Sequence, residues 1–476
     1  MRRSEKRGAF LWLGLACFLL CAPSCQLTWT HGDVDTTGGY ISDVQYDDQG
    51  GVHILYYTVG DKDAAVRYAT CSGQCDDSNN WSRVVLLEGA VKSASLAVGP
   101  SGSVHVLVQE PAELPRGVYY TSCSGECGRP ENWPAPLFLG FPKYTLHMMN
   151  NFNLVVDDNE HPRGTIVGYD PDLRQLFVDY LYCDERCLSA ESWSSVRIAA
   201  FPDAPWVQDL VDHSLERNGT AYVVTYAYSR FWPPSFNLLS RYCLGDCTDP
   251  SNWSDGPSLP IGNCDEQGLQ TFCYRWSPVR IRSDGSAAFV GTKLDWGTGV
   301  PVTTLEYRSY VDPQGSDFSW VEIGQDLRST SLALTRPSSP DVAPTPRIAA
   351  LSEDGLTYVS CDYGCAQVAN WHRQLVDPLV VATNDGGTWP RIALNSSQLP
   401  GIAYKAIASG EEVLRFAPGS NAPPPWGPAT EAAASVYGVR TSEKAAEANY
   451  MLLGAIPVLA GLLSIIGRIR RVHRRR

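Results

Sequence analysis

The chain has 476 residues, which is enough for two or three average domains or for one large repeat fold. Its composition, 44% apolar residues with 41 Gly, 33 Pro, 14 Trp and 23 Tyr, is typical of a folded protein rich in strands and turns and excludes a largely disordered chain. The formal net charge of −13 argues against nucleic acid and anionic membrane surfaces as partners.

Residues 1–24 are expected to be a secretion signal. A basic stretch that includes Arg2, Arg3 and Lys6 precedes an apolar run over residues 9–22, which is too short to span a bilayer comfortably. Small residues come before Cys25, as they do in bacterial lipoprotein signals. Two alternatives remain open, lipidation of Cys25 or ordinary cleavage near Ser24, and both predict an exported protein.

From residue 40 onward one motif recurs at a period of roughly sixty residues, the pattern Cys-x3-Cys-x5-Trp. It occurs at Cys71/Cys75/Trp81, Cys123/Cys127/Trp133, Cys183/Cys187/Trp193, Cys243/Cys247/Trp253 and Cys361/Cys365/Trp371. A degenerate copy keeps the frame with Tyr310, Gln314 and Trp320. Units begin near residues 40, 93, 150, 208, 276, 330 and 389, so seven units are predicted, with six as the alternative.

Each unit contains short β-rich runs separated by turns, with a further run after the Trp, which predicts four antiparallel strands per unit. Repeated four-stranded units are typical of a β-propeller, so the fold class is predicted to be all-β, a seven-bladed propeller over residues 25–417. The last unit lacks cysteines. Its outer strand is expected from residues 27–30, which would close the ring and cover a sheet edge, or from the segment around Trp426.

The cysteines are expected to pair as disulfides. An even number remains once the signal and Cys25 are set aside, and an exported protein enters an oxidising compartment. The predicted bridges are Cys71–Cys75, Cys123–Cys127, Cys183–Cys187, Cys243–Cys247, Cys264–Cys273 and Cys361–Cys365. Each short bridge would join the third and fourth strands of a unit and contribute on the order of 2 kcal/mol. Zinc sites usually need pairs that converge in space, so no metal and no cofactor are predicted.

The Trp of each unit is predicted to pack between neighbouring units. The alternative is an exposed ring of aromatic residues that stacks on carbohydrate.

The C-terminal part predicts a tether. Residues 418–449 are rich in Pro, Ala, Ser and Glu and are expected to form a stalk. Residues 450–467 are apolar without charge, and the arginine-rich tail 468–476 follows, so one transmembrane helix with a cytoplasmic C-terminus is predicted. A removable sorting tail is the alternative. The expected location is the cell surface or the periplasm.

The strand pattern and terminal Trp of the units, over about residues 40–420, resemble the repeats of sialidase-type propellers. The segment 384–389, Asn-Asp-Gly-Gly-Thr-Trp, comes nearest to the turn of that family's repeat. The resemblance implies a propeller fold in an exported bacterial surface protein. In that family an arginine triad, a Tyr/Glu nucleophile pair and an Asp acid/base form the active site; here Arg347-Ile-Ala and Arg391-Ile-Ala carry part of the arginine motif.

The innermost strands of the units should bring one residue each to a mouth of the central channel. Aligned from each turn, these residues are Asp43, Ser95, Asn153, Asp212, Arg280, Ser331 and Arg391. Among them Asp43, Asp212, Arg280 and Arg391 are predicted to bind a polar ligand. The alternative is that they are solvated strand ends.

No complete catalytic motif is found, so the leading hypothesis is a non-enzymatic binding or adhesion module for a protein or a glycan. Two alternatives are a sialidase-like carbohydrate-active enzyme that uses the same four residues and a structural envelope scaffold.

Overall fold

The computed structural model describes residues 27–58, 64–89, 91, 93–109, 115, 117–140, 152–170, 172–173, 175–202, 206–215, 221–231, 234–256, 259–260, 272–275, 279–281, 286–295, 302–310, 318–336, 344–380, 390–408 and 410–421. The chain divides into two units, 1–421 and 422–476, and the second lies wholly outside the described residues. The predictions for the signal 1–24, Cys25, Cys264, the transmembrane segment 450–467 and the tail 468–476 also lie outside them. A search of the described part of the chain found no helix with the length and apolar character of a membrane span.

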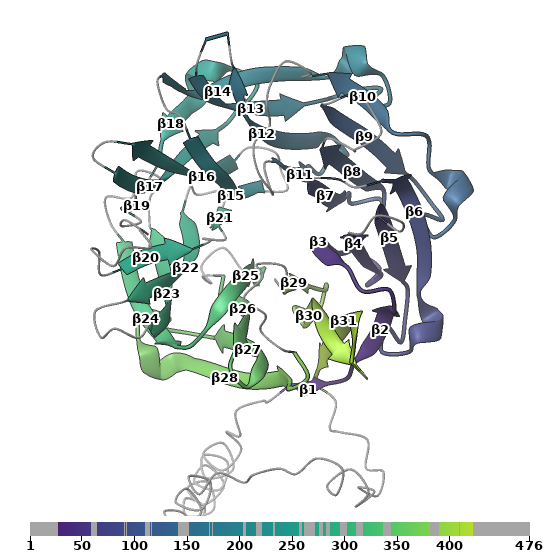
Figure 1. The fold of residues 1–476 in the computed structure, drawn as a ribbon, viewed down its shortest axis with the longest axis vertical. Coiled ribbons are helices and arrows are strands. Elements are labelled where there is room, and N and C mark those ends of the chain that lie inside the picture. The colour runs from purple at the N-terminus through teal and green to yellow at the C-terminus, as the bar shows by residue number, and fades with distance from the viewer. Residues whose placement is uncertain are drawn as a thin grey trace, which may run out of the picture. The chain divides into compact units, whose positions relative to one another are not determined.

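The described strands pair into seven antiparallel sheets that surround a central axis (Figure 1). They are numbered here as sheets 1 to 7. Sheet 1 contains β3 (Tyr40–Tyr46), β4 (Val52–Thr58), β5 (Ala65–Cys71) and β6 (Ser82–Glu88). Sheet 2 contains β7 (Ser93–Val98), β8 (Val104–Gln109), β9 (Val118–Cys123) and β10 (Leu137–Gly140). Sheet 3 contains β11 (Phe152–Val156), β12 (Pro162–Asp170), β13 (Gln175–Tyr182) and β14 (Ser194–Pro202).

The remaining sheets follow in chain order. Sheet 4 contains β15 (Trp206–Leu215), β16 (Ala221–Phe231), β17 (Pro234–Leu244), β18 (Trp253–Asp255) and β19 (Leu259–Pro260). Sheet 5 contains β20 (Phe272–Arg275), β21 (Val279–Ile281), β22 (Ala287–Asp295), β23 (Val302–Tyr310) and β24 (Phe318–Gln325). Sheet 6 contains β25 (Arg328–Leu334), β26 (Pro346–Ser352), β27 (Gly355–Cys361) and β28 (Trp371–Asp377). Sheet 7 contains β29 (Arg391–Leu394), β30 (Pro400–Ala408), β31 (Glu411–Ser420) and, from the N-terminal region, β1 (Thr28–Trp29) and β2 (Gly32–Asp35). The all-β prediction, with four-stranded antiparallel sheets, is confirmed.

The inner strands β3, β7, β11, β15, β21, β25 and β29 form a continuous ring. Each contacts the inner strand of the next sheet, and β29 contacts β3. Between the sheets lie apolar layers, such as the one that joins Val66 and Tyr68 of sheet 1 to Leu96 and Val106 of sheet 2. Both faces of most sheets are therefore buried, which explains why strands such as β8 are apolar at nearly every position.

The five Cys-x3-Cys pairs of the repeat are disulfides, as predicted: Cys71–Cys75, Cys123–Cys127, Cys183–Cys187, Cys243–Cys247 and Cys361–Cys365. Each one lies between the third and fourth strands of its sheet. Each disulfide is followed by a one-turn 3₁₀ helix. In chain order these helices are η1 (Ser78–Asn80), η2 (Pro130–Asn132), η3 (Ala190–Ser192), η4 (Pro250–Asn252) and η5 (Val368–Asn370).

The spacing of the motif has a direct physical reason in these loops. In all five the Trp side chain returns to the loop, and its indole Nε1 donates a hydrogen bond of 2.8–3.0 Å to the carbonyl of the second Cys. The disulfide fixes that carbonyl, so the Cys pair and the Trp act as one unit. This geometry requires the five-residue interval.

The same Trp residues pack against an aromatic residue of the preceding sheet, as predicted. Ring centroids are 4.8–5.7 Å apart in the pairs Phe416–Trp81, Tyr68–Trp133, Tyr120–Trp193, Tyr180–Trp253 and Tyr307–Trp371. Trp320 of the degenerate unit differs, since it is 54% exposed. Its unit has no Cys-x3-Cys pair, and Gln314, at the position of the second cysteine, lies outside the described residues.

The ring closes through the N-terminal segment. β1 and β2 both pair with β31, so strands from the two ends of the propeller share sheet 7 (Figure 1). Trp29 takes the place of the missing repeat Trp, with its ring 5.3 Å from that of Tyr358. The predicted closure by residues 27–30 is confirmed, whereas Trp426 lies outside the described residues.

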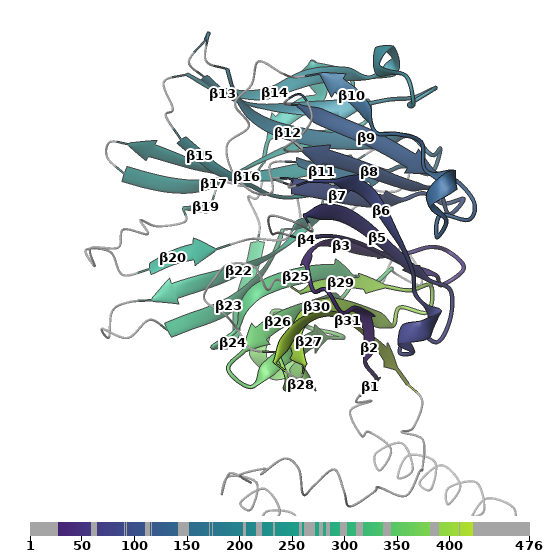
Figure 2. The same cartoon turned by 45° about the vertical axis from the view of Figure 1, so that its right-hand side comes forward.

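Among the described sheets, sheet 4 has the longest strands. β16 and β17 each have 11 residues, compared with 7 in β4 and β5 of sheet 1. Figure 2 shows β15, β17, β20 and β23 projecting to one side of the ring. The hairpin tip between β16 and β17 pairs with the start of β15 at Trp206, so the projection is at the end where the inner strands begin. The molecule is therefore asymmetric at that face.

Candidate functional site

Three inner strands carry β-bulges at equivalent positions next to predicted site residues. In β3 the register shifts between Ile41 and Asp43, and in β15 it shifts between Leu210 and Asp212. In β25 the shift immediately precedes Ser331. Bulges turn a side chain away from the regular alternation of a strand and are frequent beside active sites. The backbone of the ring is thus modified at the position that the sequence alignment selected.

Asp43 lies on β3 and is held by hydrogen bonds to both carboxylate oxygens. The backbone N–H of Val44 donates to Oδ1 at 2.8 Å, and Nε2 of Gln45 donates to Oδ2 at 3.3 Å. Asp43 is half-buried, and its carboxyl group is surrounded closely enough by protein for burial to act on its pKa.

This environment makes Asp43 a weaker acid than usual. Burial raises the pKa of its carboxyl group to about 6, because the charged form loses hydration. The positive charges of Arg391 and Arg280 and the two hydrogen bonds act in the opposite direction and limit the rise. A carboxyl group with a pKa near neutrality, beside arginines at the centre of a ring, is a candidate for proton transfer.

Arg391, at the start of β29, lies next to β3. Its Nε donates a hydrogen bond of 2.9 Å to the carbonyl of Ser42, the bulge residue, so the guanidinium is anchored beside Asp43. The charge of Arg391 also acts on Tyr57, whose pKa is raised by burial. Asp43, Arg391 and Tyr57 therefore belong to one electrostatic group that sheets 1 and 7 assemble.

Three further residues of this group, Tyr57, Tyr40 and Lys405, were not predicted from the sequence. The rings of Tyr40 and Tyr57 stack with centroids 5.5 Å apart, and Nζ of Lys405 lies 4.9 Å from the ring centre of Tyr40. Lys405 also forms an ion pair of 2.5 Å with Glu412. The stacking of Tyr40 on Tyr57 depends on the register of β3 with β4, which places the two residues opposite each other. That register could not be predicted from the sequence.

The other aligned residues divide into two groups. Ser95 and Ser331 are buried, and their hydroxyl oxygens accept hydrogen bonds from the backbone N–H of Leu154 and of Ile392 on the next inner strand. They connect adjacent sheets and do not line the channel. Arg280 on β21 acts on Asp43 through its charge. For Asp212 and Asn153 only the backbone is described, on β15 and β11.

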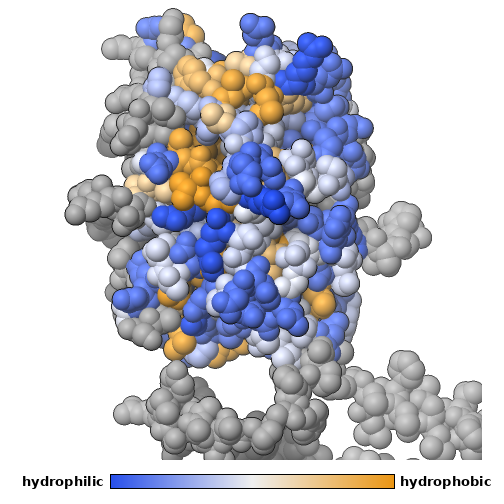
Figure 3. Space-filling view, turned by 90° about the vertical axis from the view of Figure 1, so that its right-hand side faces the viewer, coloured by the Kyte–Doolittle hydropathy of each residue, from blue (hydrophilic) through white to orange (hydrophobic). Residues whose placement is uncertain are grey.

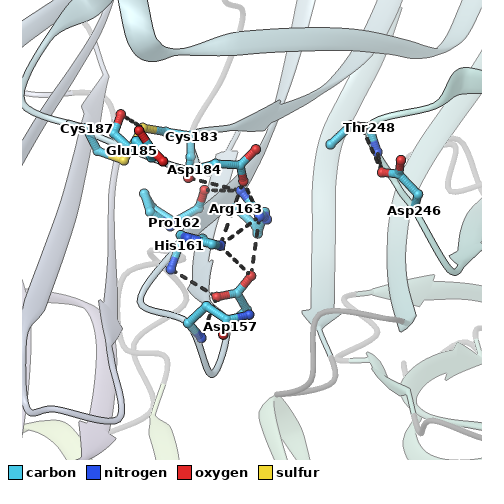
Figure 4. Close-up of polar contacts among 11 residues, drawn as sticks. Asp157, His161, Pro162, Arg163, Cys183, Asp184, Glu185, Cys187, Asp246 and Thr248 are labelled. Carbon is cyan, nitrogen blue, oxygen red and sulfur yellow. Dashed lines mark hydrogen bonds and ion pairs between the residues drawn. A yellow bond between two sulfur atoms is a disulfide. The ribbon is translucent and has the colours of Figure 1, made fainter.

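A second polar cluster surrounds Arg163 on β12 (Figure 4). Nη1 of Arg163 donates to the carbonyl of Cys183 at 3.0 Å, and Nη2 forms ion pairs with Asp184 at 2.6 Å and Asp157 at 3.3 Å. Arg347 of sheet 6 repeats the arrangement with the carbonyl of Cys361 and the carboxylate of Asp362. A contact that recurs in another sheet is a structural link between the second strand and the disulfide loop.

Metal binding finds no support in this part of the chain. Within the ranges that the structure describes, no three His, Cys, Asp or Glu residues lie close enough to hold a metal ion. The side of the molecule shown in Figure 3 is largely hydrophilic, with several apolar patches. The polar and aromatic group around Asp43 is therefore the main candidate site.

Comparisons with known proteins support the fold. No protein-family model and no curated protein matches the chain. Among solved structures, polysaccharide lyase Uly1 is 7% identical and covers 83% of this chain and 99% of its own, with a TM-score of 0.50. At the level of the fold, the chain resembles sialidase-type β-propellers. The Fusarium graminearum α-L-arabinofuranosidase Arb93A (12% identity, 69% of this chain and 92% of that chain, TM-score 0.46) and a Trypanosoma rangeli sialidase (8% identity, 80% and 54%, TM-score 0.42) are further matches.

These matches correct one prediction. A non-enzymatic binding or adhesion module was predicted from the sequence, but the solved structure with this fold, polysaccharide lyase Uly1, bears the name of an enzyme, so the alternative reading is taken up below as a proposal. The prediction was wrong because it relied on local motifs. In this fold the inner strands are about sixty residues apart in sequence, so a site assembled from them leaves no contiguous motif.

Proposed function

We propose that the chain is a carbohydrate-active enzyme that cleaves an acidic glycan at the mouth of the central channel. The observation that carries this proposal is Asp43, a buried carboxyl group with its pKa raised to about 6 beside Arg391 and Arg280. A group with this pKa exchanges a proton near neutral pH. The likeness of the fold to polysaccharide lyase Uly1 adds support.

The residues divide the chemistry between them. Asp43 would give a proton to, or take one from, the reacting part of the sugar. Arg391 and Arg280 would bind a carboxylate of the substrate, because a guanidinium pairs well with planar anions. The stacked rings of Tyr40 and Tyr57 offer a flat surface for a sugar ring. Glycan binding therefore belongs to the same site as cleavage.

The shape of the ring favours a polymer as substrate. The long hairpin of sheet 4 projects to the same side of the ring as β20 and β23 of sheet 5, the sheet whose inner strand β21 carries Arg280 (Figure 2). A wall on one side of the mouth supports several sugar units outside the reacting one. A small glycoside would use only the centre.

The test is cleavage of a panel of acidic and neutral polysaccharides by the purified protein. New reducing ends that appear with the ultraviolet absorbance of an unsaturated uronate would indicate elimination, and reducing ends without that absorbance would indicate hydrolysis. Asp43→Asn should abolish either reaction, while Asp158→Asn, an exposed carboxylate in the β11–β12 turn, should leave it unchanged. Neutral glycans should react poorly because they give the arginines nothing to bind. Absence of cleavage across the whole panel would refute the proposal.

We also propose that the seven described sheets are the complete set of blades, and that the domain is exported and held at a membrane by residues 450–467 behind the stalk. The ring of inner-strand contacts supports the blade count, and the apolar run with its arginine tail supports the anchor. Mass spectrometry of the mature protein tests the processing. It should find residues 1–24 removed and the C-terminal tail retained, and it decides whether Cys25 carries a lipid.

A further inference from the structure

Gln45 lies two residues after Asp43 on β3 and contacts both that residue and the neighbouring sheet. Its Nε2 donates to Oδ2 of Asp43 at 3.3 Å and to the carbonyl of Leu96 at 2.8 Å. Its Oε1 accepts from the backbone N–H of Val98 at 2.9 Å. Leu96 and Val98 belong to β7, the inner strand of sheet 2. One side chain thus connects Asp43 to the next sheet.

These contacts fix the orientation of the amide. A backbone N–H can only donate and a carbonyl can only accept, so Oε1 must face Val98 and Nε2 must face Leu96. The remaining hydrogen of Nε2 is then directed at Asp43. If the amide were rotated, Nε2 would face the N–H donor of Val98 and Oε1 would face the carbonyl of Leu96. The Asp43 carboxylate therefore meets a fixed donor whose direction the main chain of sheet 2 determines.

We propose that Gln45 is a positioning residue, which uses the main chain of sheet 2 to hold the Asp43 carboxylate in one orientation toward the channel. The importance of this role for catalysis rests on the proposed function, but the geometry does not. The Val44 N–H holds the other carboxylate oxygen, and the charged groups that act on Asp43 are Arg391 of the adjoining strand β29 and Arg280 of β21, the inner strand of sheet 5. Gln45 is the neutral contact on the side of sheet 2.

The experiment compares Gln45→Met with Gln398→Met in the full chain. Methionine has a similar shape but cannot donate to a carboxylate. Gln398 is a matched control, because its Oε1 accepts from the backbone N–H of Arg336 at 2.6 Å across sheets 6 and 7 without contacting Asp43. The titration of the Asp43 carboxyl carbon is followed by NMR, and stability is followed by thermal unfolding. The pH profile of glycan cleavage is measured alongside.

In Gln45→Met the NMR midpoint of Asp43 should rise by about half a pH unit, since the charged form loses one long hydrogen bond. The acid limb of the pH profile should move with it, and kcat should fall about tenfold with KM nearly unchanged, because orientation and not substrate binding is lost. Gln398→Met should lower stability less, because it loses one exposed hydrogen bond, and should move neither the midpoint nor the pH profile.

Gln45→Glu provides a second test if the methionine variant does not fold, because the introduced carboxyl keeps the acceptor for Val98. Two neighbouring carboxyl groups titrate as a coupled pair, so the higher apparent midpoint should exceed that of the unchanged protein. An unchanged Asp43 titration in the Gln45 variants would overturn the proposal. A shifted titration in a protein that cleaves no glycan would support the positioning role and count against the proposed function.

Discussion

Asp43→Asn is expected to stabilise the folded protein at neutral pH while it abolishes cleavage. An aspartate ordinarily titrates at 3.8, and burial raises the pKa of Asp43 to about 6. The difference corresponds to at most about 3 kcal/mol of unfolding free energy, at 1.36 kcal/mol per pH unit. This figure already includes the favourable charges of Arg391 and Arg280, so the charged carboxylate lowers the stability of the folded protein even beside these arginines.

The sign of the effect follows from proton binding. Because the folded state holds this proton more tightly than the unfolded chain does, the contribution of Asp43 to stability is most favourable below pH 3.8 and is lost as the pH rises toward about 6. Asparagine cannot ionise and does not show this loss. Its oxygen still accepts from the Val44 N–H, whereas its amide nitrogen faces the Gln45 donor, a loss that is the same at every pH. The variant should therefore gain stability relative to the unchanged protein as the pH rises.

Urea unfolding at several pH values from 4 to 8 measures this directly. The difference in unfolding free energy between Asp43→Asn and the unchanged protein should be smallest at pH 4 and should reach its maximum, up to about 3 kcal/mol, above pH 6. Asp158→Asn should show no such trend, since Asp158 is exposed. A difference that is independent of pH would refute the assignment of Asp43 as a carboxyl group that destabilises the fold when it is charged.

Three further predictions concern the ring. Trp81→Phe should cost about 2 kcal/mol more than Trp29→Phe in urea unfolding. Trp81 loses its hydrogen bond to a backbone carbonyl, whereas the buried indole nitrogen of Trp29 has no hydrogen-bond partner among the described residues. Equal losses would contradict this account. Replacing both Cys361 and Cys365 by serine should lower stability by on the order of 2 kcal/mol and leave cleavage unchanged, since the loop lies between β27 and β28, outside the inner strands; a loss of cleavage in the folded variant would speak against a purely structural bridge. Arg391→Gln should raise KM for an acidic glycan at least about tenfold and move the acid limb of the pH profile upward, because a charge that lowers the pKa of Asp43 is removed; a changed pH profile with an unchanged KM would exclude substrate binding by this arginine.

The comparison of sequence with structure separates local from distant effects. The interval between Cys75 and Trp81 is set by one loop, in which the indole must reach the carbonyl of the bridged cysteine. Such a constraint acts within a few residues and repeats with every unit. A local constraint of this kind can be recognised in the sequence. The repeat, the all-β class and the five disulfides were predicted from it. For the outer strand of the last unit the sequence left residues 27–30 and the segment around Trp426 both open, and the pairing of β1 with β31 decided between them.

The sequence by itself thus determined the repeating unit, its strands and its bridges, together with the inner-strand position at which Asp43 and Arg391 stand. Only the tertiary structure decided what those positions do. Ser95 turned out to join two sheets, while Asp43 acquired a raised pKa from its surroundings and a fixed partner in Gln45. Desolvation and charge depend on which strands the closed ring brings together. Those strands are separated by tens to hundreds of residues, so no local sequence pattern predicts which of them are in contact.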